Sequence, residues 1–142
     1  MVSKHKNGVS PCPKCVELFN KYPNFNQMLQ TWFFRKQADL GNCHISEAGR
    51  GFAAQEAAFK AKASKAHYGS SAHNYNAAID IFFIDGGGKL SYHKDNYAPL
   101  VIDLPNAINW YGKKGSPFYE LPHFELNGWR SMDLKPVEPE EL

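Results

Sequence analysis

The chain has 142 residues, of which 43% are hydrophobic and 14% aromatic, enough for one compact domain with its own core. The formal net charge is only +2 and the 16 Lys and Arg residues are spread along the chain, which argues against nucleic-acid binding. No apolar run of signal-peptide or membrane-spanning length follows the basic first residues, so we expect synthesis in the cytoplasm, with no signal peptide and no membrane partner. We also expect a monomer without a nucleic-acid partner.

The first half of the chain contains two helical patterns. Residues 24–41 place apolar side chains at helical spacing, with Asn24 able to cap the start and Gly41 the end. Residues 51–65 are rich in Ala, Glu and Lys, and Phe52 and Phe59 lie seven residues apart, which predicts a helix with these two rings on its apolar stripe. Between them, residues 43–48 have a β-branched centre and are predicted to form a short strand.

The second half of the chain mixes strand and helix patterns. Residues 77–85 predict a strand, and the three glycines that follow predict a turn. Residues 99–112 are predicted as a helix that its prolines start or interrupt, and residues 118–126 as a short aromatic strand. Residues 136–142 form an acidic tail that we expect to be disordered, which leaves residues 1–135 as a single domain. Few, short strands interleaved with helices favour an α+β fold over a doubly wound sheet.

Two segments carry side chains suited to a catalytic zinc site, which commonly takes three ligands from His, Asp and Glu. His73 lies seven residues before Asp80, and the sequence ELPHFE places His123 between Glu120 and Glu125. In a regular strand Glu125 would share a face with His123, but the proline before His123 indicates that the strand begins there, so Glu120 could approach along an irregular path. Spacing alone does not choose between the two glutamates.

The cysteines raise the separate question of a structural metal site. Three cysteines, an odd number, argue against a disulfide framework. Cys12 and Cys15 have the spacing of a zinc knuckle, and the adjacent pair Cys43 and His44 could complete a set of four ligands. An adjacent pair matches the usual knuckle less well, and free cysteines are often simply buried, so both interpretations stay open.

The span from Gly49 to Glu125 resembles the zinc peptidase superfamily of D-alanyl-D-alanine dipeptidases and carboxypeptidases and of phage L-alanyl-D-glutamate endopeptidases. The signature of that superfamily is S-x-H-x-x-G-x-A-x-D, followed much later by an acidic residue, two further residues and His. The matching positions are Ser71, His73, Ala78 and Asp80, then Glu120 and His123, while Arg50 and Gln55 fit the arginine and glutamine that precede the first motif. Asn76 stands where the superfamily usually has glycine, and Asn tolerates left-handed backbone angles well.

The resemblance implies a hedgehog/DD-peptidase-like α+β fold with a small antiparallel sheet flanked by helices. It also implies one catalytic Zn²⁺ held by His73, Asp80 and His123, with Glu120 as catalytic base. The other implied positions are Arg50, which would stabilise developing negative charge, and three residues that would bind substrate or support the ligands, namely Ser71, Gln55 and Glu125.

The function implied by the resemblance is a zinc metallopeptidase that hydrolyses amide bonds in the peptidoglycan stem peptide. A short chain of this kind looks most like a phage endolysin of the L-alanyl-D-glutamate type, which would reach the cell wall through the pore of another protein. The alternatives are a D-alanyl-D-alanine carboxypeptidase and a non-catalytic, zinc-containing module that binds the wall or a protein partner.

Overall fold

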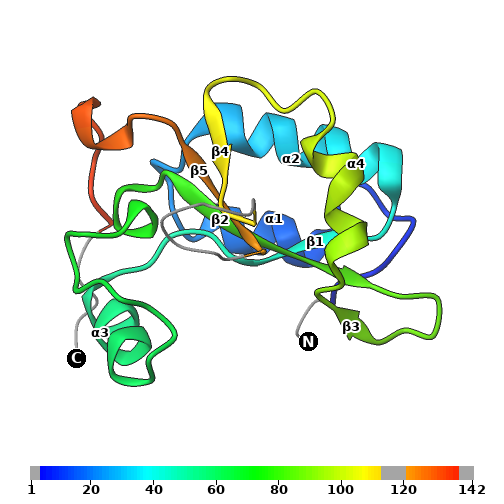
Figure 1. Cartoon of the computed structure of the whole chain (residues 1–142), viewed down its shortest axis with the longest axis horizontal. Helices are drawn as coiled ribbons and strands as arrows, with labels where there is room; N and C mark the ends of the chain where they lie inside the picture. Colours follow the sequence, from blue (N-terminus) through cyan, green and yellow to red (C-terminus); the bar gives the residue numbers. More distant parts are fainter. Residues whose placement is uncertain (1–3, 113–120, 138–142) are drawn as a thin grey trace.

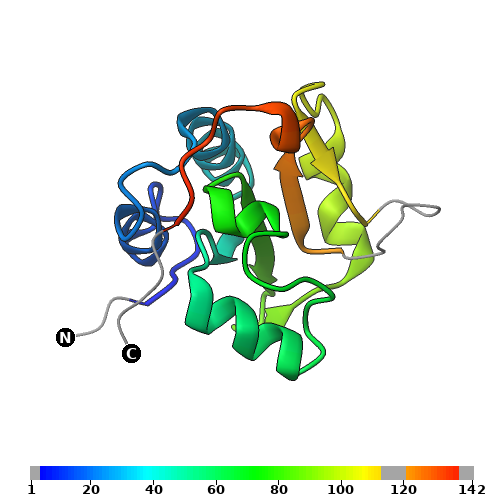
Figure 2. The same cartoon turned by 90° about the vertical axis from the view of Figure 1, so that its left-hand side faces the viewer.

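The computed structural model describes residues 4–112 and 121–137, which form a sheet with helices on both sides (Figures 1 and 2). The helices are α1 (Pro13–Asn20), α2 (Gln27–Leu40), α3 (Phe52–Lys60) and α4 (Ala98–Val101), with 3₁₀ turns η1 (Ala72–Tyr75), η2 (Lys94–Tyr97) and η3 (Trp129–Ser131). The strands are β1 (Cys43–Glu47), β2 (Ala78–Ile84), β3 (Leu90–Ser91), β4 (Ile108–Trp110) and β5 (His123–Leu126). They pair antiparallel in the order β1-β2-β5-β4, and β3 pairs with β2.

One face of the sheet forms the apolar core. Ile79, Ile81 and Phe83 alternate along β2 and are buried, as is Phe124 on β5. Trp32 of α2 packs on this face, with its ring centroid 5.3 Å from that of Phe124. In the orientation of Figure 1, α2 lies above the sheet and α3 below it, and Figure 2 shows the same separation.

The opposite face of the sheet carries polar side chains where β2 pairs with β5. Side chains two residues apart along a strand share a face, so Asp80 lies on the face opposite to Ile79 and Ile81. Asp80 pairs with His123 across β2 and β5, and Ala78 pairs with Glu125. The register of these two central strands therefore gathers one histidine and two carboxylates on the same side of the sheet.

The helix predicted over residues 24–41 is present, with a later start. Asn26, not Asn24, caps it by accepting a hydrogen bond from the Leu29 amide at 3.0 Å. Gly41 ends the helix in a left-handed conformation with φ of 79°, as its position in the sequence indicated. The strand predicted at residues 43–48 is also confirmed as β1.

The prediction of one helix over residues 99–112 is wrong. Only Ala98–Val101 is helical, and Ile108–Trp110 is β4, which pairs with β5. Asp103 adopts a left-handed φ of 58°, and Pro105 has no backbone N–H to donate, so the chain turns back toward the sheet. Pairing with β5 then outweighs the weak helical pattern of this segment.

The helix predicted near residues 51–65 is confirmed as α3, but its apolar stripe is not buried. Phe52 and Phe59 are 43% and 39% exposed, and the buried side chain of α3 is that of Gln55. The buried contact of this helix is therefore polar, while Phe52 and Phe59 contact the Tyr68 and His67 rings at the surface.

The two ends of the described chain differ from expectation. α1 was not anticipated from the sequence, although Pro13 at its first turn is a recognised start signal. Val137, inside the predicted tail, is 9% exposed, and its amide donates to the Asn74 carbonyl at 2.6 Å. Residues 138–142 of that tail and residues 118–120 of the predicted aromatic strand lie outside the described residues. Within the described ranges, no helix has the length and apolar character needed to span a bilayer.

Candidate functional site

Three residues that the sequence placed in a catalytic metal site lie together in the structure. His73 comes from η1, Asp80 from β2 and His123 from β5. Asp80 Oδ1 lies 3.2 Å from His73 Nε2 and 3.1 Å from His123 Nδ1. One potential ligand atom from each residue lies within 4.8 Å of the other two, so the group is compact enough to hold a metal ion.

Both histidines are oriented by a second hydrogen bond on the far side of the ring. His73 Nδ1 lies 2.7 Å from the Ala48 carbonyl oxygen, so this nitrogen carries a hydrogen, which leaves Nε2 toward Asp80. His123 Nε2 lies 2.8 Å from Glu125 Oε1, which leaves Nδ1 toward Asp80. Donation of the other ring N–H to a carbonyl or carboxylate is the usual arrangement for a metal-binding histidine.

The spacing of these atoms fits a tetrahedral ion. With metal–nitrogen and metal–oxygen bonds near 2.1 Å, neighbouring ligand atoms are about 3.4 Å apart. The two separations from Asp80, 3.2 and 3.1 Å, are close to this value. The donor set of two imidazoles and one carboxylate therefore fits a zinc ion with a fourth position left open.

Glu125 is fixed on both carboxylate oxygens. Oε1 accepts from His123, and Oε2 accepts from the Tyr111 hydroxyl at 2.9 Å and from Trp129 Nε1 at 2.8 Å. Tyr111 also stacks on the His123 ring, with centroids 5.2 Å apart and planes 8° from parallel. Burial alone would raise the pKa of Glu125, but the hydrogen bonds from His123, Tyr111 and Trp129 lower it, so the group is a carboxylate.

The electrostatics of the group favour charged forms. Burial alone would raise the pKa of Asp80, but the charges and hydrogen bonds of His73 and His123 hold it well below its ordinary value. Burial alone would lower the pKa of His123, but hydrogen bonds to Asp80 and Glu125 raise it to about 9. Without metal, His123 is thus an imidazolium held between two carboxylates.

The turn that carries His73 is built by local hydrogen bonds. Ser71 caps η1, since its hydroxyl accepts from the His73 amide at 3.3 Å, and Asn74 Oδ1 accepts from the Ser71 amide at 3.1 Å. Asn76 ends the turn at φ 59° and ψ 33°. The left-handed conformation expected at this position is therefore present with Asn in place of glycine.

Arg50 is not a solvated surface residue but a buried one, 8% exposed. Glu47 binds its guanidinium through Nε at 2.7 Å and Nη2 at 2.6 Å, and Gln55 Oε1 accepts from Nη1 at 2.9 Å. Arg50 lines a cavity of about 470 Å³ together with His73, Asp80 and His123. The bidentate contact with Glu47, which sequence reasoning missed, fixes the direction of this cation.

Two pockets meet at the candidate metal group. The second, of about 390 Å³, is lined by Tyr111, Glu125, Trp129 and Arg130, and it shares Ser64, Ser71 and His123 with the first. An extended substrate could therefore occupy both sides of the group. Glu120 lies outside the described residues, while the two residues after it, Leu121 and Pro122, line the first pocket.

The cysteines that the sequence singled out are only partly brought together. Cys12, Cys15 and His44 form a compact group, but its fourth member is His5 and not Cys43. Cys43 and His44 are neighbours in β1, so their side chains point to opposite faces of the sheet. Alternation along a strand was the signal that Cys43 and His44 could not both join the cysteine pair, although it does not say which of them does.

No family model matches the sequence, and no curated protein matches it significantly. A solved structure is similar: the crystal structure of the Serratia marcescens L-Ala D-Glu endopeptidase ChiX, with a TM-score of 0.67 and 18% sequence identity. The match covers 87% of this chain and 93% of that chain. The predicted α+β fold with a small antiparallel sheet is thus confirmed, and the chain has a DD-peptidase-like fold similar to that of an L-Ala D-Glu endopeptidase.

Proposed function

We propose that this chain is a zinc-dependent peptidase that hydrolyses an amide bond of the peptidoglycan stem peptide. The observation that carries the proposal is the convergence of His73, Asp80 and His123 where two pockets meet. The similarity in fold to an L-Ala D-Glu endopeptidase supports the same class of bond. Within that class, we assign the L-alanyl-D-glutamate bond and a role as a phage endolysin in host lysis, as the sequence resemblance implies.

The three ligands suit zinc, because two imidazoles and a carboxylate leave a fourth tetrahedral position for water. When bound, zinc would lower the pKa of that water toward neutrality and polarise the scissile carbonyl. The protein contributes the orientation of the ligands: Ala48 holds the His73 ring and Glu125 holds the His123 ring.

We assign the general base to Glu120, which matches the acidic position of the superfamily motif. Its carboxylate would accept a proton from water as the water oxygen adds to the carbonyl carbon. As the C–N bond breaks, the same carboxyl would deliver that proton to the leaving amine nitrogen. The pocket position of Leu121 and Pro122, directly after Glu120, supports this assignment.

Glu125, the rival base on spacing alone, suits a positioning role better. Both of its oxygens are already engaged, Oε1 with His123 and Oε2 with Tyr111 and Trp129. A carboxylate that accepts three hydrogen bonds has a low pKa and is a poor proton acceptor.

Arg50 is assigned the stabilisation of negative charge on the carbonyl oxygen. Its guanidinium is held by Glu47 and Gln55, and Arg50 lines the same pocket as His73 and Asp80. A donor held in place before reaction needs no reorganisation as charge develops, which is the physical basis of this kind of catalysis. Ser71 lines both pockets and caps the turn of His73, so it can orient that ligand and contact substrate.

Digestion of purified peptidoglycan tests the proposal. The native protein should release fragments with new amino termini on D-glutamate, and a chelator should stop the release. Glu120→Gln should lower the rate by roughly 10²–10⁴-fold, because the proton transfer is lost. Glu125→Gln is the matched control and should lose only about 10–100-fold, the usual effect of removing a residue that supports a metal ligand.

The digestion products and the two glutamate variants also distinguish the proposed function from its alternatives. Release of terminal D-alanine alone would indicate a D-alanyl-D-alanine carboxypeptidase. Binding of zinc and peptidoglycan without any cleavage would indicate a non-catalytic module. Full activity of Glu120→Gln with an inactive Glu125→Gln would show that the two glutamates have been assigned the wrong way round.

A further inference from the structure

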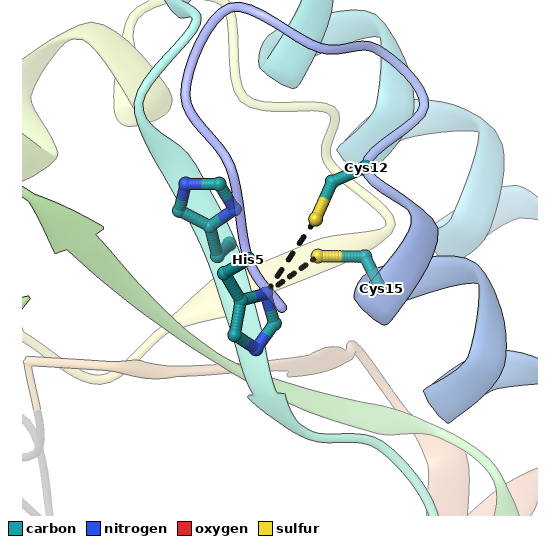
Figure 3. Close-up of side chains that lie close together, drawn as sticks. His5, Cys12 and Cys15 are labelled. Carbon is teal, nitrogen blue, oxygen red and sulfur yellow. Dashed lines mark hydrogen bonds between the residues drawn. The ribbon is translucent and has the colours of Figure 1, made fainter. Parts of the chain in front are cut away.

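A second group of potential metal ligands consists of His5, Cys12, Cys15 and His44. Figure 3 shows the His5 ring facing both sulfur atoms, with Nδ1 3.6 Å from Cys12 Sγ and 3.5 Å from Cys15 Sγ. In a tetrahedral zinc site with bonds of about 2.3 Å to sulfur and 2.05 Å to nitrogen, neighbouring N and S atoms are about 3.6 Å apart. The arrangement of these three side chains therefore has the dimensions of such a site.

His44 presents one ring nitrogen that has no other partner. Asn7 Nδ2 donates to the Ile84 carbonyl at 3.0 Å, which turns Asn7 Oδ1 toward His44 Nε2 at 2.7 Å. Because Nε2 must carry the hydrogen of this bond, Nδ1 carries a lone pair. His44 Nδ1 is buried and has no hydrogen-bond partner among the described residues, an arrangement that costs free energy unless something binds there.

Two hydrogen-bond donors point at the Cys15 sulfur, although without a metal ion burial raises the pKa of this thiol to about 12. It accepts a hydrogen bond from the Ile45 amide at 3.4 Å and another from Gln37 Nε2 at 3.6 Å. Gln37 is itself buried, and its Oε1 accepts from the Cys12 amide at 2.9 Å. Hydrogen bonds of this kind orient metal-bound sulfur and spread its negative charge.

The burial of the group fits a neutral metal complex. Cys12, Cys15 and His44 are each fully buried, and the Phe82 ring packs 4.9 Å from that of His5 and 5.6 Å from that of His44. Two thiolates and two neutral imidazoles cancel the charge of one divalent cation. Burial of that complex avoids the cost of an unpaired charge inside the protein.

We propose that His5, Cys12, Cys15 and His44 bind a structural Zn²⁺ that fastens the N-terminal segment and α1 to the edge strand β1. Thiolate and imidazole ligands in a tetrahedral set select zinc, and four protein ligands leave no position for a substrate. None of the four side chains is among the described residues that line the two pockets. The site is thus separate from the proposed catalytic centre and does not depend on it.

A redox role for the Cys12–Cys15 pair fits the structure less well. A cysteine that exchanges disulfides must be reached by its partner thiol, and both side chains have 0% exposure. Cys43 provides a matched control, because it is a third free cysteine with the same complete burial, one residue from His44 and outside the ligand group.

Cobalt titration of the full chain tests this site, because Co²⁺ bound to thiolate gives an intense near-ultraviolet charge-transfer band that histidine and carboxylate ligands do not give. The native protein and Cys43→Ser should show the band at one Co²⁺ per chain. Cys12→Ser and Cys15→Ser should bind Co²⁺ at least about tenfold more weakly, with a diminished band. Asn7→Ala should weaken binding by roughly tenfold or more, because the His44 ring loses its orienting acceptor.

The remaining outcomes are equally decisive. Two zinc ions per native chain and one in Cys12→Ser support both sites, whereas one zinc per native chain with a full thiolate band supports this site and contradicts the catalytic one. If the Cys→Ser variants do not fold, the band of the native protein alone decides. A native protein with no thiolate band, or one isolated with a Cys12–Cys15 disulfide, overturns the proposal.

Discussion

His123 is in contact with an acidic group on each of its ring nitrogens. Nδ1 lies 3.1 Å from Asp80 Oδ1 and Nε2 lies 2.8 Å from Glu125 Oε1. The two contacts have different consequences. Asp80 is a candidate ligand of the same metal ion as His123, whereas Glu125 bonds to the other ring nitrogen and fixes the orientation of the ring. In the metal-free protein both contacts favour the imidazolium, so a metal ion must displace the proton from Nδ1 before it can bind.

The stability of the metal-free protein should therefore depend on pH through His123. Its pKa of about 9 in the folded protein lies above the ordinary value of 6.5, so the stabilisation is complete below pH 6.5 and is lost as the pH rises through 9. The free energy of unfolding should fall by about 3 kcal/mol over this range. Urea unfolding of chelator-treated protein at a series of pH values measures the change.

The control for this pH dependence is His67→Gln, which replaces an exposed histidine. Its free energy of unfolding should fall with rising pH as in the native protein. His123→Gln should remove this dependence. Asp80 and Glu125 act in the opposite direction: their pKa values are lowered from 3.8 and 4.5, so their stabilisation is present above these values and is lost as the pH falls further. If the free energy of unfolding did not change between pH 6.5 and 9, the conclusion that His123 is an imidazolium between two carboxylates would be wrong.

Asn76 is the one position at which the first sequence motif departs from its superfamily pattern. The structure places it in the left-handed region, where Asn is tolerated better than other residues with a Cβ. Its side chain also donates to the Lys135 carbonyl at 3.2 Å, a contact that glycine cannot make. The residue type thus indicated the backbone conformation, whereas the contact with Lys135 depends on a segment 59 residues away.

At the scale of elements, the buried amide of Gln55 makes four of the hydrogen bonds that hold α3, and Glu56 adds others to His67 and the Tyr68 amide. Gln55 Oε1 accepts from Arg50 Nη1 at 2.9 Å and from Asn74 Nδ2 at 3.1 Å. Gln55 Nε2 donates to Ser64 Oγ at 3.0 Å and to the Ala66 carbonyl at 2.7 Å. This amide therefore connects α3 to the guanidinium and the turn that form one side of the first pocket.

Gln55→Ala should destabilise the protein far more than truncation of an aromatic residue on the same helix. Loss of the amide leaves buried polar groups without a partner and should lower the free energy of unfolding by about 2–4 kcal/mol. Phe59→Ala removes a ring that is 39% exposed, and we expect a loss below about 1 kcal/mol. Urea unfolding compares the two variants, and a larger loss for Phe59→Ala would show that the aromatic stripe attaches α3 after all.

The elements differ in how far the sequence predicted them. α2, β1 and β2 follow from local patterns and from local end signals such as Gly41. The segment at residues 99–112 was misassigned because β4 has only three residues, too few for a periodic signal, and exists through its pairing with β5. A short strand is stabilised by a partner that its own sequence does not identify.

At the scale of the whole molecule, each of the three tryptophans contacts a residue of β5. Trp32 of α2 and Trp110 of β4 pack on Phe124, with ring centroids 5.3 and 6.2 Å apart, and Trp129 donates to Glu125. Their positions in α2, β4 and η3 span most of the chain. Contacts of this kind couple the helical and sheet layers within one core.

We therefore expect cooperative unfolding of a single domain. The denaturant transition measured by tryptophan fluorescence should coincide with the transition measured by far-ultraviolet circular dichroism, in protein with constant metal content. Two separate transitions would show that residues 1–135 do not form one folding unit and would contradict the single-domain prediction.

The sequence by itself determined which residues share a face and which local motifs are available. Alternation along the strand placed Glu125 beside His123, and the spacing of Cys12 and Cys15 marked them as a possible pair of ligands. These conclusions hold because side-chain direction repeats every two residues in a strand, whatever lies nearby.

Only the tertiary structure decided which distant groups complete each site. It joined Arg50 to Glu47 and placed Arg50 in the same pocket as His73, and it selected His5 over Cys43 as the neighbour of the cysteine pair. These choices depend on strand order and register and on where the N-terminal segment packs. Such contacts arise from burial and hydrogen bonding between segments far apart in the chain, and local sequence does not specify them.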